Sequence, residues 1–191
     1  LSEWRRVADW RLTQLRKIPH VSLYPGSLMT AADVLESGVR DVIVATGATW
    51  RRDGIGRSHW KPVPGCNQPH IFTPDDLMAG KLPSGKVLIF DDDHYYMGGV
   101  LAELLAEAGC QVTLATPAPL VSAWTQYTLE QDRTHKRLHQ LGVRLVTQTA
   151  LAGIGSGVVT LAQVVSDSAE NIPCDAVVLV TDRLPNDGLY Q

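Results

Sequence analysis

The segment from Lys86 to Gly109 constrains the fold more than any other part of the sequence. Its apolar run from Val87 to Phe90 ends in an acidic turn, and a stretch rich in Ala, Leu and Glu follows. A buried strand, a tight turn and a helix in this order form the first unit of a dinucleotide-binding sheet. We therefore expect an α/β fold with a Rossmann-like parallel sheet around this segment.

The turn carries carboxylates where a dinucleotide-binding turn carries glycines. Asp91 and Asp93 occupy the first two glycine positions, and Gly98 follows near the start of the helix. Glycines at these positions let the backbone approach a pyrophosphate at the helix N-terminus. A carboxylate about 4 Å from a phosphate instead costs roughly 4 kcal/mol at an effective dielectric constant near 20. The turn therefore predicts a degenerate site that keeps its shape and has lost its ligand.

Asp at a helix N-terminus is also an ordinary cap, which fits a degenerate turn. Residual nucleotide binding stays open as an alternative. The sequence Asp91-Asp92-Asp93-His94 also offers oxygen and imidazole ligands for Mg²⁺ or Mn²⁺. Three adjacent acids cannot all point at one ion from a turn, so we expect no metal here.

Composition excludes several classes of partner. The net charge of −3 among 191 residues gives no electrostatic reason to expect nucleic acid or an anionic membrane. No apolar stretch approaches the roughly 18 residues of a membrane-spanning helix. The three cysteines are far apart, without the spacing of a zinc or iron–sulfur site, which indicates a reduced cytoplasmic location. The chain starts without Met, which suggests a fragment or a processed chain.

Alternating patterns continue beyond the acidic turn. They predict a βαβαβ unit followed by an antiparallel β-meander and a last buried strand. The predicted elements are strand 86–91, helix 98–108, strand 111–116, helix 128–141, strand 143–147, strands 150–154 and 158–165, and strand 176–181. The glycines from 153 to 157 fit a hairpin turn better than a nucleotide loop, because no helix follows them. His135 and His139 have i, i+4 spacing but no metalloprotease signature, so we expect a solvated helix face there.

The apolar pattern of the first 85 residues is less regular and predicts shorter elements. Helical spacing covers 3–17 and 30–36, while 21–24 and 41–48 read as strands, the second of them buried. Residues 49–85 are rich in Pro and loop-like, apart from a helix at 73–80, and form the expected crossing between two domains.

Two short motifs flank the central unit and are more informative together than apart. One is Val44-Ala45-Thr46-Gly47-Ala48, and the other is Val180-Thr181-Asp182-Arg183-Leu184-Pro185-Asn186-Asp187. Both resemble the crossover motifs of flavoproteins in which an outer FAD- or ADP-binding domain is interrupted by an inner NAD(P)H-type domain. The resemblance implies that Thr46, Gly47, Asp182 and Arg183 bind the adenine nucleotide of the outer domain.

The whole chain resembles the C-terminal region of the trimethylamine, dimethylamine and histamine dehydrogenases and of related NADH:flavin oxidoreductases such as 2,4-dienoyl-CoA reductase. The segments that carry the resemblance include Glu3-Trp4, Asp9-Trp10-Arg11, Met29 to Leu35, Val42 to Trp50, Pro62 to Gly65, Thr73 to Met78, Asp91 to Met97 and Thr128-Leu129-Glu130.

That family implies a larger enzyme, in which an N-terminal TIM barrel holds FMN and a 4Fe-4S cluster. The resemblance divides this chain into a partial outer FAD/ADP-binding-type domain (1–80), an inner NAD(P)-type domain with a degenerate fingerprint (81–174) and a return strand to the outer domain (175–191). It implies ADP or FAD at a partial outer site, contact with the enzyme's own barrel, and a homodimer of the full-length protein.

Three functions remain. A dienoyl-CoA-type reductase feeds hydride from NAD(P)H through the inner domain and needs its glycines. An amine dehydrogenase passes electrons outward to a carrier such as an electron-transfer flavoprotein, so it can lose these glycines. Asp91 and Asp93 therefore favour the dehydrogenase, with a non-catalytic nucleotide- or protein-binding module as the third possibility. If Trp10 is exposed, its ring could contact the electron carrier; otherwise it is a core residue of its helix.

Overall fold

The computed structural model describes residues 2–190 of the chain. It divides into two compact units, one comprising Thr46–Asn186 and the other Leu1–Ala45 with Asp187–Gln191. Within the part that is described, no helix is both long and apolar enough to cross a bilayer.

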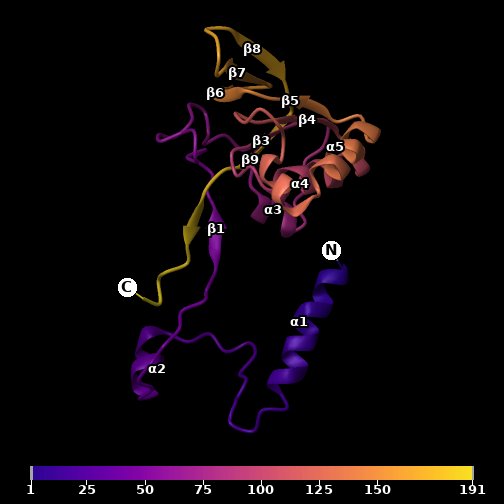
Figure 1. The fold of residues 1–191 in the computed structure, drawn as a ribbon. Helices are drawn as coiled ribbons and strands as arrows, with labels where there is room; N and C mark the ends of the chain where they lie inside the picture. The colour runs from indigo at the N-terminus through magenta and orange to yellow at the C-terminus, as the bar shows by residue number, and fades with distance from the viewer. Residues whose placement is uncertain (1, 191) are drawn as a thin grey trace. The chain divides into compact units, whose positions relative to one another are not determined.

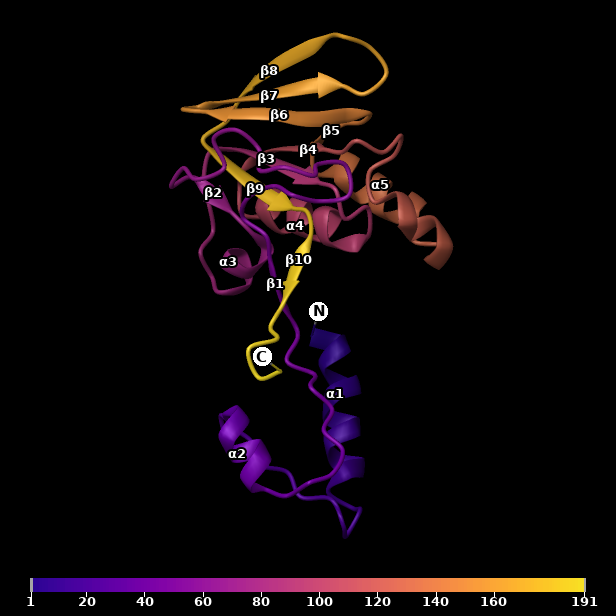
Figure 2. The same ribbon diagram turned by 90° about the vertical axis from the view of Figure 1, so that its left-hand side faces the viewer.

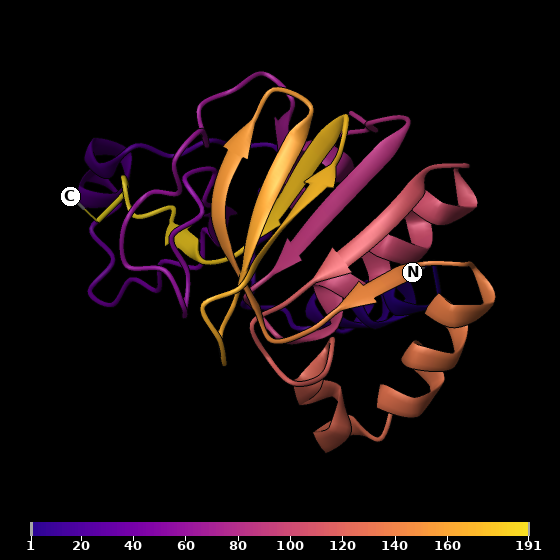
Figure 3. The ribbon, with the colours of Figure 1, turned by 90° about the horizontal axis from the view of Figure 1, so that it is seen from above.

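A five-stranded parallel sheet forms the centre of the larger unit (Figures 1 and 3). Its strands lie in the order β2-β9-β3-β4-β5, and every neighbouring pair is parallel. The bounds are β2 (Ile71–Phe72), β9 (Ala176–Val180), β3 (Lys86–Asp91), β4 (Gln111–Ala115) and β5 (Arg144–Val146). The predicted parallel α/β sheet is therefore confirmed, and β2 joins it from within the segment expected to be a loop.

The two faces of this sheet have different covers (Figure 2). Helices α4 (Tyr96–Glu107) and α5 (Gln131–Gln140) lie on one face, with the short α3 (Pro74–Met78). A three-stranded antiparallel sheet lies on the other, formed by β6 (Thr149–Gly155), β7 (Val158–Gln163) and β8 (Ala169–Pro173). The predicted antiparallel meander is present, although the residues of β8 were not assigned to it.

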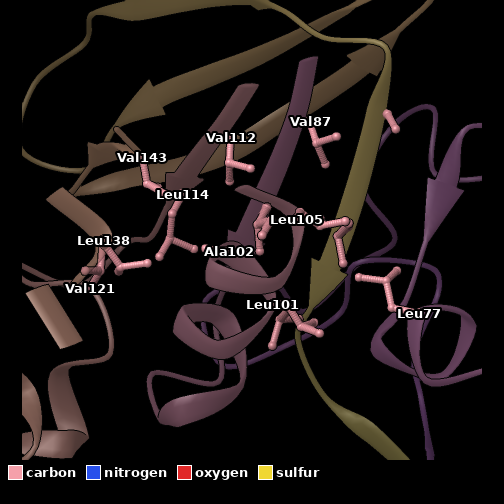
Figure 4. Packing of buried hydrophobic residues seen from close by; sticks show 14 of the residues in the cluster. Leu77, Val87, Leu101, Ala102, Leu105, Val112, Leu114, Val121, Leu138 and Val143 are labelled. Atoms are coloured by element: carbon pink, nitrogen blue, oxygen red, sulfur yellow. The ribbon is translucent and has the colours of Figure 1, made fainter. Parts of the chain in front are cut away.

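Strand β3 shows how the core is built. Val87 and Ile89 face the helices and belong to the same hydrophobic cluster as Leu101 and Leu105 of α4. Figure 4 shows Val87 with these two leucines. Leu88 and Phe90 face the antiparallel sheet on the opposite side. A strand buried on both faces reads as a continuous apolar run, because each face receives every second side chain.

Two short strands lead out of the larger unit side by side. β1 (Ala48–Trp50) and β10 (Arg183–Pro185) pair antiparallel, with Trp50 opposite Arg183. We call this pair the crossover ribbon. It joins segments more than 130 residues apart in sequence.

The smaller unit contains two helices, α1 (Ser2–Leu15) and α2 (Ala31–Glu36), the second with a capping box between Thr30 and Asp33. The predicted strand at 21–24 is wrong, and so is the strand at 41–48 except for its last residue. Ile43, expected to be buried, is 92% exposed. An isolated strand is unstable without a neighbouring strand, and residues 21–24 and 41–47 pair with no strand within the described residues.

Two helix boundaries also differ from those expected. α4 begins two residues earlier than predicted, at Tyr96. α5 begins three residues later, because a 3-10 helix, η1 (Ala123–Thr128), and a left-handed Leu129 (φ +60°) precede it. The segment after β4 therefore forms a separate turn at the carboxyl end of the sheet.

Candidate functional site

The acidic turn lies at the carboxyl end of β3, between the strand and α4. The backbone N–H groups of Asp92 and Asp93 donate to the carbonyl of Val180, at 2.9 and 3.2 Å, so the turn is fastened to the end of β9. Open α/β sheets bind ligands at this edge. The turn is therefore the candidate ligand site of this sheet.

Asp91 closes the turn from inside. Its side chain is 0% exposed, and its Oδ1 accepts the backbone N–H groups of Asp93 (3.1 Å) and His94 (3.0 Å). This is the local side-chain-to-backbone bonding by which Asp stabilises turns. A Cβ atom on Gly98 would lie only 2.6 Å from the carboxyl carbon of Asp91. Gly98 thus makes room for this carboxyl group beside the first turn of α4.

The environment of Asp91 favours its neutral form. Burial raises its pKa to about 7, and the charges of Asp93 and Asp92 act in the same direction, against the two amide hydrogen bonds. Its second oxygen, Oδ2, has no hydrogen-bond partner in the described part of the chain. The carboxyl group therefore takes up a proton much more readily than an exposed Asp does.

Asp92 fixes a neighbouring loop to the turn. Its carboxylate accepts the backbone N–H of Ser58 at 2.7 Å and the Ser58 hydroxyl at 2.6 Å. The imidazole Nε2 of His94 lies 3.4 Å from the same carboxylate. His94 has a left-handed backbone (φ +65°), and burial lowers its pKa despite the nearby Asp92. At pH 7 the imidazole is therefore neutral, and Asp92 acts as a structural anchor.

Asp93 connects the turn to the crossover ribbon. Its Oδ1 lies 3.1 Å from a guanidinium nitrogen of Arg183, whose Cζ is 4.5 Å from the centre of the Trp50 ring. The structure therefore brings together two groups that the sequence suggested separately, the acidic turn and the arginine of the return strand. Trp50 was not expected here, although it ends one of the segments that carry the family resemblance.

The other candidate nucleotide-binding residues lie farther along the ribbon. Thr46 donates its hydroxyl to the carbonyl of Asn186, whose side-chain amide donates to the Thr46 carbonyl at 3.1 Å. Gly47 accepts the Asn186 backbone N–H at 2.9 Å and has a left-handed backbone (φ +76°). Asp182 is exposed and accepts the backbone N–H of Arg183 at 2.7 Å. Thr46 and Gly47 thus make these contacts with Asn186, and not with the acidic turn.

Trp10 lies on α1 in the smaller unit and is 63% exposed. His135 departs from the expected solvated helix face, because its Nε2 lies 2.9 Å from the Val121 carbonyl oxygen. Within residues 2–190, no group of three or more His, Cys, Asp or Glu side chains is arranged to hold a metal ion. The acidic turn is thus an arrangement of carboxyl groups and the donors that they accept from.

Comparison with known proteins identifies the family. Residues 72–173 match the family model described as the OYE-like second alpha/beta domain. The chain belongs to the OYE-like second α/β domain family.

Relatives of this OYE-like second domain include several amine-oxidising enzymes. Dimethylamine dehydrogenase from Hyphomicrobium sp. (strain x) is 34% identical over 100% of this chain. Histamine dehydrogenase from Rhizobium sp. 4-9 is 43% identical with a TM-score of 0.93, again over the whole chain. The amine oxidase for 6-hydroxypseudooxynicotine from Pseudomonas geniculata N1 is 44% identical, with a TM-score of 0.96 over 100% of this chain. The predicted family resemblance is therefore confirmed.

The chain corresponds to part of each relative. It covers 29% of the dimethylamine dehydrogenase, 30% of the histamine dehydrogenase chain and 29% of the amine oxidase chain. An OYE-like second domain is thus one region of these larger enzymes.

Proposed function

We propose that this chain is the accessory C-terminal region of a flavoprotein amine dehydrogenase that passes its electrons to a carrier protein. The observation that carries the proposal is the state of the acidic turn. The Asp91 carboxyl group accepts the backbone N–H groups of the turn, and the Asp93 carboxylate forms an ion pair with Arg183. A reductase fed by NAD(P)H through this domain needs such donors free for the dinucleotide phosphates. The residues of the inner turn therefore do not fit NAD(P)H.

The rest of the enzyme follows from the resemblance. We propose an N-terminal barrel that holds FMN and a 4Fe-4S cluster and oxidises the amine. In this scheme the inner Rossmann-like domain is residues 81–174, and residues 1–80 and 175–191 belong to an outer FAD/ADP-binding-type domain. The crossover ribbon supports this division, because it brings the outgoing and returning strands side by side. The exposed apolar side chains between Val7 and Val44 support it further, since an outer domain would bury them.

ADP or FAD is the proposed ligand of the outer domain. Gly47 fits a phosphate neighbour, because its backbone is left-handed and no atom lies within 4 Å of the position where a Cβ would stand. Thr46 adjoins it, while Asp182 and Arg183 follow on the paired strand. We propose that these four residues complete a nucleotide site whose remaining part is supplied by the outer domain.

The proposed partner is an electron-transfer flavoprotein, and the exposed ring of Trp10 is the proposed contact. We further propose a cytoplasmic homodimer. The free thiols of Cys66, Cys110 and Cys174 agree with a reducing compartment.

The test compares electron donors in the full-length protein under anaerobic conditions. We expect dimethylamine, trimethylamine or histamine to bleach the flavin absorbance, and we expect NADH and NADPH to leave it unchanged. Bleaching by NADPH but by none of the amines would instead establish the alternative, an NAD(P)H-dependent flavin oxidoreductase of the dienoyl-CoA reductase type. A full-length protein without flavin would leave the non-catalytic module as the function.

A further inference from the structure

Three successive backbone donors of the acidic turn have acceptors within the chain. The N–H groups of Asp93 and His94 point at the Asp91 carboxyl group, and the N–H groups of Asp92 and Asp93 point at the Val180 carbonyl. Successive N–H groups in such a turn form the concave cradle that binds phosphates in other α/β proteins. Here the cradle is already filled by a carboxyl group.

The space beside the helix is filled by the same group. α4 is 12 residues long, and its first turn contains Gly98 and Gly99 in succession. The position of a Cβ on Gly98 is 2.6 Å from Asp91 Oδ2, an oxygen that is buried and has no partner among the described residues. The positive end of a helix dipole attracts an anion to this position. Asp91 therefore lies where a bound phosphate would be stabilised.

A second unpartnered oxygen lies at the same helix start. The hydroxyl of Ser122 is buried, has no hydrogen-bond partner within residues 2–190, and lies 3.0 Å from the position of a Cβ on Gly99. Ser122 also has a left-handed backbone (φ +49°) without being glycine. A buried hydroxyl without a partner costs about 1–3 kcal/mol. This feature is expected where a polar ligand once supplied the missing bond.

The guanidinium group of Arg183 forms an ion pair with the Asp93 carboxylate. Asp93 is buried, whereas the side chain of its partner Arg183 is 48% exposed and stacks on Trp50. An arginine at this edge of the sheet, held against an aromatic ring, is well placed to bind a phosphate. In this structure the Asp93 carboxylate is the anion that pairs with this guanidinium.

We propose that the side-chain carboxyl groups of Asp91 and Asp93 keep a dinucleotide-phosphate site closed, and that replacing both residues with glycine opens it to pyrophosphate. The inference rests on the proposed function and deepens it, because it names the residues that exclude NAD(P)H from the inner domain. Asp91 removes the amide donors and the space at the helix start, and Asp93 removes the guanidinium. Asp92 is not part of the closure, because it anchors Ser58.

The test is a gain of binding in the full-length protein. Inorganic pyrophosphate and NADPH are titrated by calorimetry into the wild type, the Asp91→Gly/Asp93→Gly variant, and a charge-matched control, Asp167→Gly/Asp187→Gly. Both control residues are exposed. We expect the site variant to bind pyrophosphate at least tenfold more tightly than the wild type, and the control variant to bind like the wild type. Adding Arg183→Leu to the site variant should remove most of the gain, measured against a variant that carries Arg183→Leu alone.

The outcomes separate the two proposals. Saturable micromolar NADPH binding by the wild type would overturn both. A folded site variant that binds pyrophosphate no better than the wild type would overturn this inference alone, as would an equal gain in the control. If the site variant does not fold, Asp93→Gly alone provides the test, with an expected affinity gain of about threefold from the released Arg183. No gain in that folded variant would overturn the inference as well.

Discussion

Two apolar runs of this chain have nearly the same sequence pattern and opposite environments. The run from Val87 to Phe90 is buried completely between two layers. The run from Val42 to Val44 is exposed, and Ile43 at its centre keeps 92% of its accessible surface. The first run pairs with strands on both sides, whereas the second belongs to no strand. An apolar run thus becomes a strand only where the chain supplies neighbouring strands and a layer to cover it.

The largest expected effect is a difference in independent stability. A fragment of residues 46–186 contains the whole parallel sheet and both of its covers, so it should unfold in one cooperative transition. A peptide of residues 1–45 should show no cooperative transition, because its described apolar side chains are largely exposed. Circular dichroism during heating measures both. A cooperative transition in the peptide would break the comparison.

Asp91, which follows the buried run, should make the stability of the fold depend on pH in an unusual way. The pKa of Asp91 is about 7 in the folded chain against an ordinary value of 3.8, because burial penalises its charge. The folded state therefore binds more protons, so stability falls as the pH rises from about 4 to about 7 and then levels off. The difference of about three pKa units corresponds to about 4 kcal/mol.

Asp91→Asn isolates this contribution, because the amide does not ionise. The free energy of unfolding, measured in urea at several pH values, should fall by about 4 kcal/mol less in the variant than in the wild type over this range. His94 acts in the opposite sense, since burial lowers its pKa, but it is present in both proteins. Parallel pH profiles for the two proteins would contradict a buried, proton-binding Asp91.

Matched truncations test the two runs directly. Ile89→Ala should cost about 2–5 kcal/mol of unfolding free energy, because the side chain is fully buried. Ile43→Ala should change it by less than about 0.5 kcal/mol, as at other exposed positions. Urea unfolding of the same chain measures both. A cost above about 2 kcal/mol at Ile43 would show that this run is packed.

The effect of Gly98→Ala on stability should be smaller, and its sign should depend on whether position 91 is Asp or Gly. Gly98→Ala places a methyl group against Asp91 and should destabilise the wild type by about 1–3 kcal/mol. In an Asp91→Gly background the same change should stabilise by up to about 1 kcal/mol, because Ala favours a helix over Gly. Thermal unfolding of the four proteins completes this double-mutant cycle. The same sign in both backgrounds would show that Asp91 does not fill this space.

The sequence predicted the fold best where neighbouring elements follow one another along the chain. Strand 86–91, the helix after it and strand 111–116 were all found, because their apolar spacing and short connections are local signals. β2 was missed, because two residues carry no periodicity and its pairing partner Val177 is more than 100 residues away. The prediction of a strand at 41–48 was wrong, because a local apolar pattern does not show whether another strand is available to pair with it.

The candidate site was only partly predictable. The acids at the glycine positions are visible in the sequence, and Asp91 and Asp93 do lie in the turn. That Asp93 meets Arg183 could not be predicted, because the contact joins residues 90 positions apart through the crossover ribbon. Nor do neighbouring aspartates reveal that Asp92 bonds Ser58 while Asp91 keeps an oxygen without a partner, since only the folded loop decides this.

Amide hydrogen exchange of this chain, resolved by residue, tests the account most directly. We expect slow exchange from Val87 to Phe90 and at the N–H groups of Asp93 and His94, which donate to Asp91. Val42 to Val44 should exchange at the rate of an unprotected chain. Exchange at Asp93 and His94 as fast as at Ile43 would show that the turn amides are free, and would contradict a turn closed by its own carboxyl group.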